Sequence, residues 1–148
     1  MYDQPRPDRS APVTTFDQML ERVRYEGAYP TRERAEEAVR TVLGALGRQV
    51  TGDERVALAQ CLPVEAALVL TAQIPATEKL TGWGFVKDLA DRTGASPAVA
   101  RWDVGAVLAA VTRLAGPDLL DRILLQLPDG YALLFGQAQL RRPQPVAA

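Results

Sequence analysis

The side chains that most often carry chemistry are sparse in this chain. Its 148 residues include one cysteine, Cys61, and no histidine. The commonest metal ligand and the usual base at neutral pH are therefore missing. A nucleophilic thiol needs a base or a positively charged neighbourhood, whereas Cys61 lies among Leu58, Ala59 and Leu62 in the sequence. We expect Cys61 to pack in or near the core, and we expect no metal or cofactor site.

The acidic residues fit structural roles better than catalytic ones. Asp53 and Asp118 stand at expected helix starts, where the helix dipole favours a negative charge. The pairs Glu36-Glu37 and Asp88-Asp91 lie among arginine and lysine residues, which is typical of a solvated helix face. A catalytic pair needs carboxylates in a desolvated cleft with separated pKa values, and this pattern does not predict one. The sequence therefore predicts a protein without catalytic residues.

Charge and residue types argue against nucleic-acid binding. The formal net charge is −1, so the chain has no overall basic field that would attract a polyanion. A helix that reads DNA needs several basic or amide side chains on one face. The segment 53–62, which could imitate a recognition helix, offers only Arg55 and Gln60.

The apolar residues of the chain bear on membrane insertion and on cellular location. The apolar run Val64–Ile74 is about half of the roughly 20 residues that a spanning helix needs, so no membrane span is predicted. The first eight residues hold no apolar core of the kind found in signal peptides. These observations lead us to expect a soluble cytoplasmic protein.

Helical periodicity and capping signals organise the whole chain. Thr15 and Gln18 form a capping-box pattern at the first helix. We expect two long central helices over Thr31–Val50 and Ser96–Ala115, each with an apolar stripe of Ala, Leu and Val residues. The sequence therefore predicts an all-α fold.

Both halves of the chain repeat one pattern. An offset of 65 residues pairs Pro63 with Pro128, and the same offset matches further apolar and capping positions. These matches predict an internal duplication, with two tandem helical repeats of three to four helices each packed into one globular bundle. We expect repeat one at about 15–74, a connector at about 75–82 and repeat two at about 83–139.

The proline-rich ends differ from this helical region. Residues 1–13 and 141–148 combine prolines with charged or small residues, and such segments do not bury enough apolar surface to offset the entropy of ordering. We expect both to be flexible tails around a single helical domain at 14–140. The segment Thr77–Leu80 within the connector is expected to form a helical turn.

The segments Met19–Val23, Arg34–Leu43 and the Leu62-Pro63 break resemble the first half of a bacterial family, the domain of unknown function numbered twenty-two sixty-seven. The second half is similar through Phe85–Leu89, Thr93–Pro97, Gln126–Pro128 and Tyr131–Phe135. The resemblance covers roughly residues 16–137 and implies a small, duplicated helical protein without an assigned activity. It supplies no catalytic residue.

Aromatic residues are the remaining functional signal, because tryptophan and tyrosine are common in binding hot spots; for most of them, packing in or near the core is the default expectation. We name Trp102, Trp83 and Tyr131 as candidate partner-binding residues, and we expect Trp102 to lie beside the apolar stripe of its helix. Two hypotheses follow. The first is a non-enzymatic protein-interaction or scaffold module with an unknown protein partner. The alternative is a helical protein that binds a small apolar ligand in a pocket between the repeats.

Overall fold

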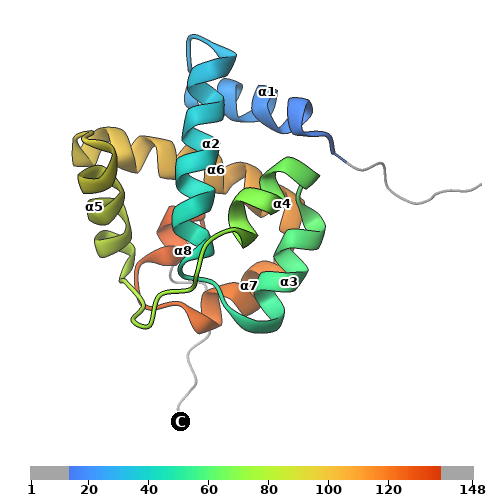
Figure 1. Cartoon of the computed structure of the whole chain (residues 1–148), viewed down its shortest axis with the longest axis vertical. Coiled ribbons are helices and arrows are strands. Elements are labelled where there is room, and N and C mark those ends of the chain that lie inside the picture. The colour runs from blue at the N-terminus through green and yellow to red at the C-terminus, as the bar shows by residue number, and fades with distance from the viewer. Residues whose placement is uncertain (1–13, 138–148) are drawn as a thin grey trace, which may run out of the picture.

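A computed structural model describes residues 14–137 of the chain. Within this range the regular elements are eight helices and no strands (Figure 1). They are α1 (Phe16–Gly27), α2 (Arg32–Gly47), α3 (Gly52–Cys61), α4 (Val64–Thr71), α5 (Gly82–Thr93), α6 (Pro97–Ala115), α7 (Pro117–Gln126) and α8 (Tyr131–Leu134). The predicted all-α fold is confirmed. The expected tails, 1–13 and 141–148, lie outside the described residues.

Side-chain caps begin α1, α2 and α6 close to their predicted starts. The Thr15 hydroxyl accepts the Gln18 backbone N–H at 3.1 Å, and the Gln18 side chain accepts the Thr15 backbone N–H at 2.9 Å. This is the predicted capping box. The hydroxyls of Thr31 and Ser96 each accept a backbone N–H three residues on, at 3.1 Å. Gly94 ends α5 in the left-handed conformation, which glycine adopts without strain.

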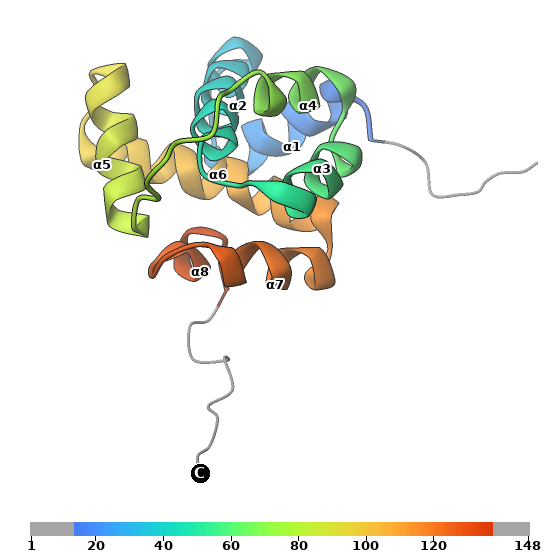
Figure 2. The ribbon, with the colours of Figure 1, turned by 60° about the horizontal axis from the view of Figure 1, so that its bottom comes forward.

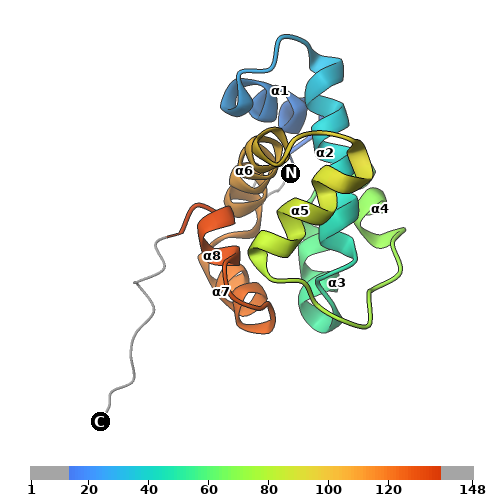
Figure 3. The ribbon, with the colours of Figure 1, turned by 90° about the vertical axis from the view of Figure 1, so that its left-hand side faces the viewer.

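The two longest helices, α2 and α6, cross near the middle of the molecule (Figure 1). Helix α1 packs on both of them, and α5 packs mainly on α6 (Figure 3). Helices α3 and α4 form a hairpin whose α4 arm lies on α2, while α7 and α8 lie below α6 in Figure 2. One apolar cluster contains residues from all eight helices, so both halves of the chain share a core.

The packing of α4 on α2 depends on Gly47 at the end of α2. A Cβ atom on Gly47 would lie 2.1 Å from the Leu70 carbonyl oxygen, a distance that real Cβ contacts do not show. The backbones of α2 and α4 therefore approach more closely here than any side chain allows. Gly44, one turn earlier, has more room, because its nearest neighbour is the flexible Gln73 side chain at 3.6 Å.

Arg55 on α3 connects the carboxyl ends of α2 and α4. Its guanidinium donates to the backbone carbonyls of Gly47, Val50, Leu70, Thr71 and Gln73. A positive charge is favourable at a helix C-terminus, where carbonyl groups lack intrahelical partners. The predicted C-terminal end of the first long helix is wrong. Helix α2 ends at Gly47 and not at Val50, because the chain turns there toward Arg55.

Two glutamines fix the chain at both ends of the segment between α2 and α5. The buried Gln49 side chain accepts the Leu80 backbone N–H at 2.8 Å. The Gln126 side chain bonds the backbone N–H and carbonyl of Thr51, at 2.8 and 3.1 Å. The predicted helical turn at Thr77–Leu80 is wrong, since no helix is present there; the Leu80 N–H bonds a distant side chain instead.

The contrast between Gly47 and Gly44 gives a matched pair of substitutions. We expect Gly47→Ala to lower the free energy of unfolding by about 1–3 kcal/mol, because the new methyl group forces α4 away from α2. We expect Gly44→Ala to leave it unchanged or raise it by up to about 1 kcal/mol, since alanine favours helix over glycine. Urea unfolding followed by circular dichroism measures both. Equal effects of the two substitutions would contradict this packing.

Candidate functional site

A buried carboxylate on α6 organises the polar centre of the molecule. Asp103 is only 8% exposed. Its Oδ1 accepts the Tyr29 hydroxyl at 2.6 Å, and the Nη2 of Arg34 donates to Oδ1 and Oδ2 at 3.1 and 3.0 Å. A buried charge without such partners costs several kcal/mol. The three residues, which we call the Asp103 triad, therefore hold the α1–α2 connection and the start of α2 against α6.

The Tyr29 ring is packed on two sides. The Arg34 guanidinium carbon lies 5.0 Å from the ring centroid, a distance suited to a cation–π contact. On another side, a Cβ atom on Gly27 would lie 2.3 Å from the ring, so only glycine fits at the end of α1. Burial raises the pKa of Tyr29 well above its usual value, and the hydrogen bond to Asp103 raises it further. Tyr29 is therefore a neutral donor to Asp103 at physiological pH.

Trp102 lies next to the triad on the surface of α6. Its Nε1–H donates to the Gly27 carbonyl at 2.8 Å, and the residue is 58% exposed. The hydrogen bond satisfies a carbonyl at the C-terminus of α1, where the following Ala28 turns into the left-handed conformation. One edge of the indole is thereby fixed, while much of its apolar surface faces solvent.

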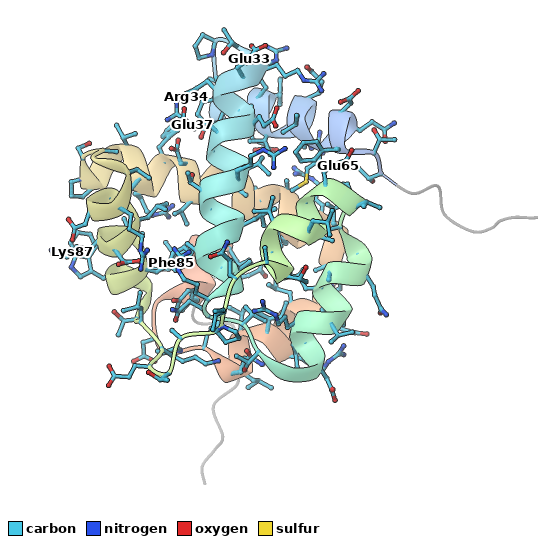
Figure 4. All side chains as sticks on the ribbon, in the orientation of Figure 1. Glu33, Arg34, Glu37, Glu65, Phe85 and Lys87 are labelled. Carbon is cyan, nitrogen blue, oxygen red and sulfur yellow. The ribbon has the colours of Figure 1, made fainter. Side chains whose placement is uncertain are left out.

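A small hollow adjoins the triad between α2, α5 and α6. Its volume is about 130 Å³, and we call it the triad pocket. Its lining consists of Arg34, Glu37, Thr41, Leu89, Thr93, Ala95, Ala100 and Asp103. Figure 4 shows Arg34 and Glu37 extending from α2 on the side where α5 meets α6. Charged and hydroxyl-bearing residues make up more than half of the lining, so the pocket suits a polar group.

A second hollow, of about 440 Å³, is an open depression on α1. It is lined by Asp17, Gln18, Glu21, Arg22 and Tyr25, all on that one helix. The small-ligand alternative requires an apolar cavity between the halves, of roughly 300 Å³ or more. The triad pocket is too small and too polar for that role, and the depression on α1 does not lie between helices. Neither hollow supports the alternative.

The three candidate partner-binding residues lie in different environments. Trp102 and Trp83 are exposed, at 58% and 64%, with Trp83 in the first turn of α5. Tyr131 is only 1% exposed, and its ring packs edge-on against Phe85 with the ring centroids 5.5 Å apart. The expectation of a surface role for Tyr131 does not fit its burial, because its ring fills the core between α5 and α8. The two tryptophans lie on different helices, Trp83 on α5 and Trp102 on α6.

Sequence reasoning missed the Asp103 triad, because Arg34 and Tyr29 lie 69 and 74 residues before Asp103. One signal was available. Asp103 lies three residues after Ala100 and four before Val107, and both of these belong to the predicted apolar stripe. A charged residue at such a position on a helix is buried and requires partners. The sequence alone does not say which residues supply them.

Cys61, possible metal ligands and possible membrane-spanning helices were also considered in the sequence. Cys61 is partly buried and packs against the core. Among residues 14–137 no group of three or more His, Cys, Asp or Glu residues is placed to hold a metal ion. In the same range, none of the helices combines the length and the apolar character needed to cross a bilayer.

The fold and this polar centre define a small all-α protein with a single shared core. The model of a family described as an uncharacterized conserved protein (DUF2267) matches residues 16–134. The chain therefore belongs to this family, as the sequence resemblance predicted. A search of curated proteins gave no match. The matched range contains the triad, the triad pocket and both tryptophans.

Two tyrosine substitutions test the triad against a matched core position. We expect Tyr29→Phe to lower the free energy of unfolding at pH 7 by about 1–3 kcal/mol, because Asp103 loses a hydrogen bond while buried. We expect Tyr131→Phe to cost less, since no described residue bonds the Tyr131 hydroxyl. Urea unfolding measures both, and an equal or smaller cost for Tyr29→Phe would contradict the triad.

The same variants should differ from the wild type at high pH. Burial raises the pKa of both tyrosines, so their contribution to stability is complete below the unfolded pKa of about 10 and is lost as the pH rises further. We expect the wild type to lose stability between pH 9 and pH 11, and each phenylalanine variant to lose less over that interval.

Proposed function

We propose that this chain is a non-enzymatic protein-interaction module that contacts its partner through Trp102. The observation that carries the proposal is the fixed orientation of this exposed indole. Binding hot spots are enriched in tryptophan, and a side chain that is already held in place loses less entropy when a partner binds. The hydrogen bond from Trp102 to Gly27 supplies this order before binding.

The neighbouring surface of α6 supports an apolar contact. Val99 lies three residues before Trp102, so the two side chains share a helix face, and Val99 is 44% exposed. We call Val99 and Trp102 together the Trp102 face. A partner that covers this pair would remove both apolar side chains from water. The absence of catalytic activity and the cytoplasmic location remain part of the proposal as predictions.

Internal duplication also remains a proposal, with some support from the geometry. Helices α1 and α5 are both 12 residues long, and α3 and α7 are both 10. The paired breaks at Leu62 and Leu127 share an extended backbone, with φ and ψ of −96° and 155° in one and −100° and 150° in the other. Superposing residues 16–71 on 82–134 tests the idea. Failure of α2 to overlay on α6 would contradict it.

Affinity capture with tryptophan variants tests the proposed function. Tagged wild-type protein, Trp102→Ala and Trp83→Ala would be used to capture partners from an extract of the organism that encodes the chain. We expect Trp102→Ala to lose a partner that both other proteins retain, at a cost of about 2 kcal/mol or more in binding, which is about thirtyfold in affinity. Circular dichroism of each variant confirms that the fold is intact.

Trp83→Ala is the matched control, because it removes an indole of similar exposure from a different helix. Trp102→Phe adds a second comparison, since it keeps an aromatic ring but removes the hydrogen bond to Gly27. Intermediate binding by Trp102→Phe is expected. Equal recovery of the partner by the wild type and Trp102→Ala would exclude the Trp102 face as the contact.

A further inference from the structure

We propose that the triad pocket binds a primary ammonium group on a short alkyl chain. This is the chemistry at the end of a lysine side chain and of small aliphatic amines. The inference goes beyond the proposed protein-interaction role, because it concerns a separate hollow with its own lining. Trp102 does not line this pocket, so either proposal can fail while the other holds.

The hydroxyl groups of the pocket are committed to donate elsewhere. The Thr41 Oγ1–H faces the Glu37 and Ala38 carbonyls, at 3.0 and 3.2 Å. The Thr93 Oγ1 donates to the Leu89 carbonyl at 2.9 Å. A hydroxyl carries one donor and two lone pairs. The Thr93 oxygen already accepts the Ala95 backbone N–H in a long contact of 3.4 Å, so each of the two oxygens keeps at least one lone pair as an acceptor. An incoming group that only donates hydrogen bonds, such as an ammonium, matches this arrangement.

The charges of the pocket favour the same ligand. Asp103 and Glu37 are negative and Arg34 is positive, so the lining has a net charge of −1. Arg34 is already engaged, because it donates to Asp103 and lies 3.8 Å from a Glu37 carboxylate oxygen. Glu37 makes only this long contact among the described ion pairs. An ammonium near Glu37 would neutralise the remaining negative charge, whereas a carboxylate would add to it.

Size and apolar lining limit the ligand to a short chain. The pocket volume of about 130 Å³ is below the 300 Å³ or more typical of sites for drug-sized molecules. Leu89, Ala95 and Ala100 supply an apolar wall that suits methylene groups. Lysine side chains behave in this way in general, with an apolar stem and a charged end. The pocket therefore fits the end of a side chain or a small amine.

Titration with butylammonium chloride, followed by ¹H–¹⁵N NMR of the full chain, tests this proposal. At constant chloride and pH 7 the amine is charged, because alkyl ammonium groups have a pKa near 10.4. We expect saturable shifts at the amides of Thr93, Ala95 and Asp103. Butyrate and 1-butanol, which share the alkyl chain, should give no saturable shifts there.

A short blocked peptide with one central lysine separates the two sources of the ammonium group. Saturable binding of the peptide assigns the pocket to lysine side chains, and binding of the free amine alone assigns it to small amines.

Two variants and a control locate the binding in the pocket. The Glu37 side chain is 69% exposed, so we expect Glu37→Gln to weaken butylammonium binding by about two- to fivefold, the range of a solvent-exposed charge pair. Thr41→Val should also weaken it, because it removes an acceptor oxygen without changing the charge. Glu33→Gln makes the same charge change on α2 outside the pocket lining (Figure 4) and should bind as the wild type does. The proposal is overturned if the wild type shows no saturable shifts with the amine, if butyrate or butanol binds equally well, or if Glu37→Gln behaves like Glu33→Gln.

Discussion

A carboxylate that cannot remain buried alone determines how the site is assembled. Asp103 lies on the inner side of α6, and the cost of removing its charge from water is offset by Tyr29 and Arg34. These partners come from the α1–α2 connection and from α2. Their contacts therefore hold the C-terminal end of α1 in position against α6. The end of α1 presents the Gly27 carbonyl to Trp102. We infer that the orientation of the exposed indole depends on the partly buried ion pair between Arg34 and Asp103.

Polar contacts outside the triad serve a different purpose. The core is built mostly from Ala, Val and Leu side chains, which pack without strongly directional contacts. Arg55 joins the ends of two helices through their carbonyl groups, and Gln126 bonds both backbone groups of Thr51. Such hydrogen bonds select one arrangement of helices among many that would bury similar apolar area.

Local signals in the sequence predicted most of the fold, and contacts between distant residues account for the errors. The helix starts at Thr15, Thr31 and Ser96 depend on hydrogen bonds within one turn, so they were predicted correctly. The end of α2 was misplaced because it depends on Arg55 and on the approach of α4. The burial of Tyr131 was missed for the same reason, since Phe85 covers it from another helix. The candidate site was only partly predicted. The sequence placed Trp102 beside the apolar stripe of its helix, but the triad requires pairings that span 69 or more residues.

Hydrogen exchange of the two indole N–H groups, measured by NMR, tests most directly whether the triad orients Trp102. The Trp102 N–H bonds the Gly27 carbonyl, whereas no described residue accepts a hydrogen bond from Trp83. We predict slower exchange for Trp102 than for Trp83, by about two- to tenfold for one hydrogen bond, and a loss of this protection in Tyr29→Phe. Equal exchange of both indoles in the wild type, or unchanged protection of Trp102 in Tyr29→Phe, would contradict the dependence of Trp102 on the buried Asp103.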